Sequence, residues 1–135
     1  PEMRGPMRWD QANEGNPEFV RLKKLVEIRQ KSAALKCGSI RFLPTASALA
    51  FARYTDQSMD DIVVVANPTE QAITEVIAPE NPWVLNFTMY DDQLNEYETQ
   101  QHSGWLLVHV PPFGVRILKP RIERDGDYSS YKRLN

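Results

Sequence analysis

The stretch from Asn16 to Gly38 constrains the fold most, because it is the only long helix that the sequence predicts. Asn16 can cap the helix, and Pro17 suits its first position, where the missing N–H of proline costs nothing. Gly38 can adopt the left-handed conformation that ends many helices. After Gly38 the apolar period changes from about 3.6 residues, typical of a helix, to about 2, typical of a strand. The sequence therefore predicts one helix followed by a β-rich domain.

Apolar residues cover about half of the circumference of this helix, a wider arc than that of a helix packed on one partner. They are Phe19, Leu22, Leu25, Val26, Ile28 and Ala33. Arg29 falls on the same arc, where it either extends its charge into solvent or pairs with an acidic group of a partner. We expect the helix to pack against two partners. If one were missing, self-association would cover the helix, so a homo-oligomer through the helix from Asn16 to Gly38 is also expected.

Short strands separated by turns are expected in residues 39–120. The expected strands are residues 40–43, 48–55, 61–67, 72–78, 83–90, 105–110 and 113–118. The first two should form one hairpin, the third and fourth a second, and the polar residues 91–103 a long loop. Six or seven strands with turns at this spacing predict a mainly β fold, an antiparallel β-sandwich.

The charge pattern excludes several classes of function. The 135 residues include 16 Lys and Arg and 18 Asp and Glu, and no basic run is dense enough for a nucleic-acid or membrane-surface footprint. No apolar run approaches the ~20 residues that span a bilayer, so we expect a soluble protein. Nucleic acid and membrane are therefore not expected partners.

The remaining reactive side chains give little signal for chemistry. Cys37 is the only cysteine, so no disulfide can form within the chain, and we expect its thiol to be buried. His102 and His109 are too isolated in sequence to predict a metal site or a catalytic pair. We predict no metal and no cofactor. The chain begins at Pro1, and we expect a piece excised from a longer protein, which leaves cytoplasmic and secreted locations open.

Residues 1–15 are expected to form an irregular loop with unusually large apolar side chains. Met7 and Trp9 alternate with Arg4, Arg8 and Asp10. Two interpretations remain open. The apolar groups can anchor the loop on a neighbouring surface, or Trp9 can stack on a sugar ring while Arg4 and Asp10 hydrogen-bond to its hydroxyls.

Three segments together resemble one enzyme family. They are Arg-Gly-Pro-Met-Arg-Trp-Asp at 4–10, Leu-Val-Glu-Ile-Arg-Gln-Lys-Ser-Ala-Ala-Leu at 25–35, and Pro-Pro-Phe-Gly-Val-Arg-Ile-Leu at 111–118. The chain resembles the C-terminal part of α-amylase-family glycoside hydrolases, most of all the branch of neopullulanases, cyclomaltodextrinases and α-glucosidases. Gly5 stands where the family commonly has a second arginine.

This resemblance implies a division into three segments. Residues 1–38 would be the loop after the eighth strand and the last helix of a (β/α)8 barrel, and residues 39–120 a Greek-key sandwich called domain C. Residues 121–135 lie beyond the family pattern, and we expect partial disorder there. The resemblance also implies that Arg4, Trp9 and Asp10 bind substrate in the full-length parent, whose barrel would be the main partner of this chain.

The resemblance further implies a parent that is a retaining hydrolase or transglycosylase acting on α-glucans such as maltodextrin and starch. Such enzymes need one carboxylate as nucleophile and another as acid and base. The family carries both on earlier barrel strands, so this chain would hold no catalytic residue. We expect it to be inactive alone.

Two other functions remain open. The same barrel and sandwich occur in amino-acid-transporter heavy chains that have lost the catalytic carboxylates, so the parent can also be an amylase-like protein without activity. A free-standing sugar-binding sandwich is the other alternative, and it needs an exposed aromatic platform. Trp83 and Trp105 are the candidates, but both alternate with core residues and we expect them to be buried.

Overall fold

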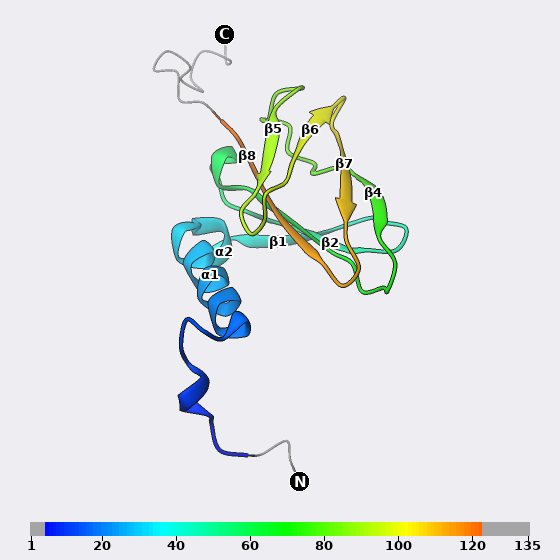
Figure 1. The fold of residues 1–135 in the computed structure, drawn as a ribbon. Helices are drawn as coiled ribbons and strands as arrows, with labels where there is room; N and C mark the ends of the chain where they lie inside the picture. Colours follow the sequence, from blue (N-terminus) through cyan, green and yellow to red (C-terminus); the bar gives the residue numbers. More distant parts are fainter. Residues whose placement is uncertain (1–4, 123–135) are drawn as a thin grey trace.

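The computed structural model describes residues 5–122 of the chain. Within them, a short 3-10 helix η2 (Trp9–Gln11) precedes α1 (Pro17–Lys31) and α2 (Ala33–Cys37), and η3 (Ser58–Asp60) follows the second strand. Figure 1 shows α1 and α2 on one side of the strands. The strands are β1 (Ser39–Leu43), β2 (Leu49–Tyr54), β3 (Ile62–Ala66), β4 (Ile73–Ile77), β5 (Met89–Asp92), β6 (Glu98–His102), β7 (Trp105–Val110) and β8 (Val115–Pro120). Arg4 and most of the expected tail, residues 123–135, lie outside the described residues.

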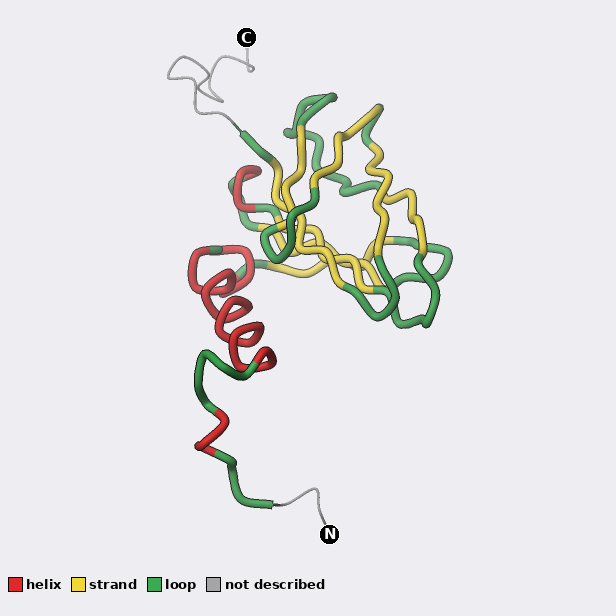
Figure 2. Tube along the Cα trace, viewed as in Figure 1, coloured by secondary structure: helices red, strands yellow, loops and turns green. Residues whose placement is uncertain are grey.

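The eight strands of the described chain form one antiparallel sheet in the order β1-β2-β3-β8-β5-β6-β7-β4. β5, β6 and β7 are successive neighbours and β4 lies beside β7, which is a Greek-key arrangement. The sheet curls so that its two halves enclose a core (Figure 2). The predicted antiparallel sandwich is confirmed, with eight strands instead of six or seven.

The core lies between the two halves of the curled sheet. Val63 and Val65 of β3 pack in one cluster with Leu118 of β8 and with Leu106 and Val108 of β7. All five are at most 1% exposed. Burying such a side chain contributes about 1.5–3 kcal/mol, so this cluster holds the two halves together.

The path between β3 and β4 differs from the sequence-based prediction of a hairpin. β3 pairs with β2 and β8, whereas β4 pairs with β7 in the other half of the sheet. The amide of Asn67 explains this path, because its Nδ2 donates to the carbonyl oxygens of Gln71 at 2.7 Å and Pro111 at 3.0 Å. The connection is thus tied to the turn between β7 and β8, and the prediction of a second hairpin is wrong.

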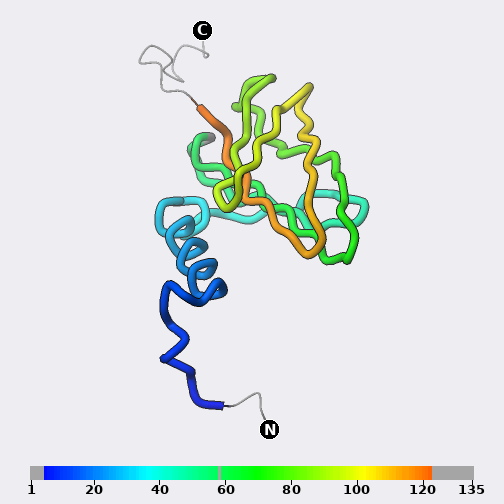
Figure 3. The backbone as a smooth tube through the Cα atoms, viewed as in Figure 1, coloured from blue at the N-terminus to red at the C-terminus, as the bar shows by residue number. Residues whose placement is uncertain are grey.

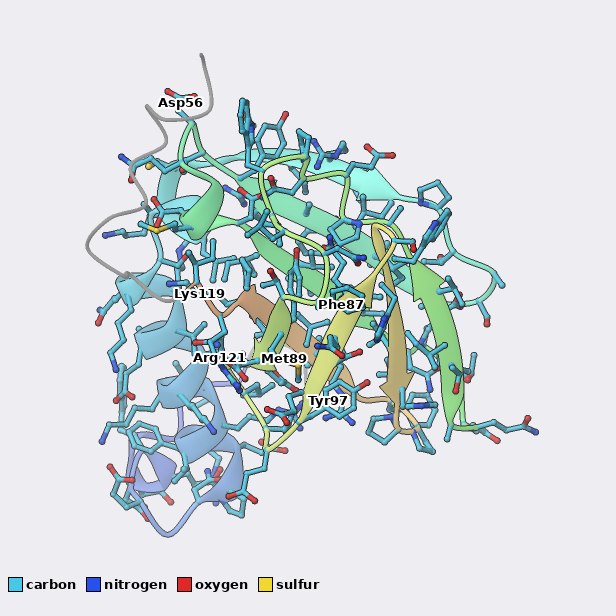
Figure 4. All side chains as sticks on the ribbon, turned by 90° about the horizontal axis from the view of Figure 1, so that it is seen from above. Asp56, Phe87, Met89, Tyr97, Lys119 and Arg121 are labelled. Carbon is cyan, nitrogen blue, oxygen red and sulfur yellow. The ribbon has the colours of Figure 1, made fainter. Side chains whose placement is uncertain are left out.

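Two further segments contradict the prediction. Residues 83–88 form turns rather than a strand, and Phe87, which lies beside β6 (Figure 4), has a φ of 68°. The polar residues 91–103, expected as a long loop, contain β6. Its side chains bond to the neighbouring strand, as when Thr99 Oγ1 donates to the Leu107 oxygen at 2.7 Å. A polar strand lacks apolar alternation, so periodicity gave no signal for it.

The helix predicted from Asn16 to Gly38 is broken at Ser32. Asn16 does cap α1, since its side chain accepts from the N–H of Glu18 at 3.0 Å. Ser32 is extended, and its Oγ accepts from the N–H of Leu35 at 3.2 Å, which starts α2. Gly38 has a φ of −70° and is not left-handed as predicted. It is needed for close approach, because a Cβ there would lie 2.6 Å from the Tyr54 carbonyl oxygen.

β8 ends at Pro120, and the expected tail begins at the next residue. The N–H of Arg121 donates to the Met89 carbonyl oxygen at 2.7 Å. Its guanidinium donates to Asp91 at 2.9 Å and to Glu98 at 2.8 Å, and Arg121 itself is labelled in Figure 4. The segment expected as a tail from residue 121 therefore begins with a residue fixed to β5 and β6.

Candidate functional site: a half-covered helix and the segment before it

One flank of α1 packs on the outer surface of the sandwich. Leu25 and Ile28 are half-buried against a small cluster that includes Ile62 of β3 and Ile117 of β8. This cluster is separate from the core between the two halves of the sheet. The helix is therefore held against the sandwich by this packing contact (Figure 1).

A buried carboxylate holds the turn on which α1 rests. Lys24 Nζ of α1 donates to the carbonyl oxygen of Leu94 at 2.5 Å. Asp92 Oδ1 accepts from the N–H groups of Leu94 at 3.0 Å and Ile117 at 3.1 Å, and Arg116 Nη1 lies 3.3 Å from Asp92 Oδ2. The ion pair compensates the buried charge and fixes the turn against β8.

The other flank of α1 is exposed. Leu22 and Val26, one helical turn apart, are 60% and 45% exposed, and no residue of α1 is buried. Arg29, on the predicted apolar arc, is exposed as well. The helix thus has apolar side chains on two flanks, and within the described chain only one flank has a partner. A second partner remains a prediction.

A second exposed apolar surface lies on β1 and β2, at one edge of the sheet. Ile40, Phe42 and Leu49 are 51%, 67% and 51% exposed. The rings of Phe42 and Phe51 pack edge to face, with 6.2 Å between the ring centroids. Edge strands are usually protected by charged or short segments. An apolar edge of this kind indicates a surface that another structural unit covers.

The segment before α1 carries the residues that the sequence predicts for substrate binding. Trp9 is 75% exposed, and Arg8 Nη2 lies 3.8 Å from Asp10 Oδ2 in a solvent-exposed pair. The segment bonds to itself and to α1, as when Asn16 Nδ2 donates to the Gln11 oxygen at 3.1 Å. Figures 1 and 3 show it running away from the sandwich. Substrate binding by Arg4, Trp9 and Asp10 therefore stays a prediction.

The two candidate tryptophans of the sandwich are exposed, so the prediction that they are buried is wrong. Trp83 is 63% exposed because it lies in a turn, and Trp105 is 52% exposed because it lies on the outer face of β7. Alternate residues of β7 are buried. His109 lies on the same face of β7 as Trp105, because the two residues are four positions apart in a strand. A polar residue on that face indicates that the face is exposed to solvent.

The expectation for Cys37 is also wrong, because this thiol is exposed at the end of α2. Among residues 5–122, no three His, Cys, Asp or Glu side chains lie close enough together to hold a metal ion. None of the helices in this range is both long and apolar enough to cross a membrane.

The comparisons with known proteins define a class of fold. No protein-family model matches the sequence, and no curated protein matches it either. Solved structures do match, and several α-amylases are among them. The described chain therefore has the fold of an antiparallel sandwich preceded by a helix, a fold that it shares with part of these α-amylases.

Three of these structures can be named. The chain is similar to the α-amylase of Geobacillus thermoleovorans, solved with acarbose, with a TM-score of 0.66 and 18% identity over 79% of the chain. It is similar to a maltogenic α-amylase of Thermotoga neapolitana, with a TM-score of 0.63 and 15% identity over 82% of the chain. It is also similar to an Anoxybacillus α-amylase, with a TM-score of 0.60 and 16% identity over 78% of the chain. The chain spans only 24%, 27% and 23% of these structures, and identities this low show a shared fold alone.

Proposed function

We propose that this chain is the C-terminal part of an α-amylase-type glycoside hydrolase acting on α-glucans, and that its sandwich supports the catalytic barrel. The observation that carries the proposal is α1, which packs one flank on the sandwich and leaves Leu22 and Val26 exposed on the other. A barrel seated on this flank would bury both side chains, at about 1.5–3 kcal/mol each if fully covered.

The chemistry of the parent would come from the barrel. Retaining glycosidases use one carboxylate as nucleophile and a second as acid and base. In this proposal both belong to the barrel, and this chain contributes position. α1 fixes the sandwich to the barrel, and the segment with Arg4, Trp9 and Asp10 lies at the rim of the active site. Barrel active sites are built from loops at the strand C-termini, which is where this segment would fall.

The test is to express the chain together with the residues encoded upstream of it and to measure new reducing ends from maltodextrin, pullulan and cyclodextrin. We expect the longer protein to hydrolyse at least one of these, and the 135-residue chain to hydrolyse none. Replacing each upstream barrel carboxylate by its amide is the control, and it should abolish turnover. A longer protein with a barrel but no turnover would instead support the amylase-like protein without activity.

A free-standing sugar-binding sandwich is the second candidate. It is favoured by one observation, the exposure of Trp83 and Trp105. If no barrel is encoded upstream and the chain alone binds oligosaccharides, this candidate replaces the first.

A further inference from the structure

A cavity of about 230 Å3 lies where β2 ends and β3 begins, and the segment 80–83 forms part of its wall. Asp56, on the turn after β2, is one of its lining residues and is labelled in Figure 4. No local sequence pattern predicts this cavity, because its walls come from three separate parts of the chain. The residues that matter for its chemistry are Arg41, Tyr54, Asp61, Glu80, Asn81 and Trp83.

Polar side chains of three kinds converge on the cavity. The carboxylate of Asp61 belongs to a residue only 7% exposed, and its Oδ2 accepts from Asn81 Nδ2 at 2.6 Å. The guanidinium of Arg41 lies 4.9 Å from the centre of the Tyr54 ring. It also lies 3.1 Å from Glu80 Oε2. A carboxylate, an amide and a guanidinium are therefore fixed by their own contacts before any ligand arrives.

The backbone of the segment 80–83 keeps Trp83 at the mouth of the cavity. Glu80 has a φ of 56°, a left-handed conformation that costs a residue with a Cβ roughly 1–2 kcal/mol. Asn81 Oδ1 accepts from the N–H of Trp83 at 3.0 Å and closes the next turn. The indole is nevertheless 63% exposed, so the turn does not serve to bury it. Strained turns of this kind are common where a chain clamps a ligand.

The charges of the cavity exclude several ligands. The lining has three carboxylates, Asp56, Asp61 and Glu80, and one cationic side chain, Arg41. This excess of acidic groups disfavours binding of an anion. The ring of Tyr54 is already occupied by Arg41, which disfavours a second cation over it. Among the described residues, no group of three ligating side chains is placed for a metal ion.

An uncharged ring with many hydroxyls fits what remains. Hydroxyl groups can donate to Asp61 and Glu80 and accept from Arg41, while an apolar ring face stacks on the indole of Trp83. The volume of about 230 Å3 is below the roughly 300–1,000 Å3 of pockets for drug-sized ligands, so it suits one sugar ring.

We propose that this cavity binds one glucose ring of an α-glucan chain, with Trp83 stacking on the ring and Asp61 and Arg41 bonding to its hydroxyls. The identity of the sugar rests on the proposed function, whereas the cavity and its polar lining do not. Burial raises the pKa of Asp61 to about 6, against the hydrogen bond from Asn81 and the charge of Arg41. Sugar hydroxyls that donate to the ionised carboxylate would lower this pKa.

The experiment is a titration of the 135-residue chain with maltotriose, followed by NMR of the indole N–H signals of Trp9, Trp83 and Trp105. We expect a saturable shift at Trp83 alone. Trp83→Ala should weaken binding at least tenfold. Phe113→Ala is the control, since it removes a similarly exposed aromatic ring outside the cavity, and it should leave the affinity unchanged.

Asp61→Asn is the second variant, and it should weaken binding while the chain stays folded. In the wild-type chain, the pKa of Asp61 should fall when maltotriose is bound. The absence of a shift at Trp83, or binding that survives Trp83→Ala, would overturn the site. Equal affinity for cellotriose would overturn the assignment to α-glucans, and a shift with tetramethylammonium but no sugar would overturn the ligand class. None of these results depends on hydrolysis, so each is separable from failure of the proposed function.

Discussion

At the scale of single residues, Glu75 of β4 links the two halves of the sheet. It is 3% exposed, and its carboxylate accepts from the N–H groups of Ala46, Ser47 and Ala48 at 3.0, 2.7 and 2.9 Å. Burial alone would raise the pKa of Glu75, but these bonds and the Ser47 hydroxyl together hold it below the ordinary 4.5. The turn between β1 and β2 is thus fixed by one carboxylate on the other half.

The first prediction is that Glu75→Gln lowers the free energy of unfolding by about 2–3 kcal/mol at pH 7, because an amide accepts fewer of these bonds. A lowered pKa gives stability that is present above the ordinary value and lost as pH falls through the folded-state value. The difference between the variant and the wild type should therefore shrink below about pH 4.5 in urea unfolding. The exposed Glu70→Gln is the control, and an equal loss there would contradict the prediction.

The second prediction concerns Asp61, whose pKa is shifted in the opposite direction, to about 6. Between pH 4 and 6 the folded protein keeps a proton that the unfolded chain releases, so this residue makes the protein less stable as pH rises. Asp61→Asn should raise the free energy of unfolding by about 1–2 kcal/mol at pH 8 and change it little at pH 4. Thermal unfolding at both pH values measures this. A stability loss that is the same at both would contradict the assigned cause.

At the scale of elements, the sequence predicts an element wherever its signal is local. Asn16 and Pro17 mark the start of α1 as predicted, and β7 has its predicted bounds because Leu106, Val108 and Val110 alternate. The sandwich class follows from such strands. β6 was missed because its residues are polar, and they form a strand only through hydrogen bonds to the neighbouring strands. The partner of β4 was missed because β4 pairs with β7, a strand far away in the sequence. The cavity at Asp61 was missed for the same reason.

The third prediction tests how α1 is held against the sandwich, through Asp92, whose side chain is fully buried. Asp92→Ala removes the acceptor of Arg116 Nη1 and of the N–H groups of Leu94 and Ile117. We expect a loss of about 3–5 kcal/mol. Hydrogen exchange should also speed up in α1, because the turn that supports the helix is released.

Asp91→Ala is the matched control for this prediction. The neighbouring carboxylate pairs with Arg121 at the surface, where such pairs contribute about 0–1 kcal/mol. Equal losses of stability in the two variants would contradict the prediction. Unchanged hydrogen exchange in α1 of Asp92→Ala would also contradict it, because the turn at Leu94 would then not support the helix.

At the scale of the whole molecule, two apolar surfaces are left over after the sandwich has built its own core. They are the exposed flank of α1 with Leu22 and Val26, and the edge of the sheet with Ile40, Phe42 and Leu49. Exposed patches of this kind mark contacts with other structural units. In the proposed parent, the barrel covers them. In the 135-residue chain alone, a second copy can do so.

The last prediction is that the isolated chain self-associates through α1. Burying Leu22 and Val26 in a two-fold contact stabilises the pair by about 1.5–3 kcal/mol for each side chain fully covered. Association depends on concentration, so sedimentation velocity over about a hundredfold dilution should show dissociation into monomers. Leu22→Glu should give a folded monomer, because Leu22 makes little contact with its own sandwich, whereas Lys31→Glu, on the opposite side of the helix, should still associate. A wild-type monomer at every concentration, with rapid exchange in α1, would contradict both self-association and the claim that this flank needs a partner.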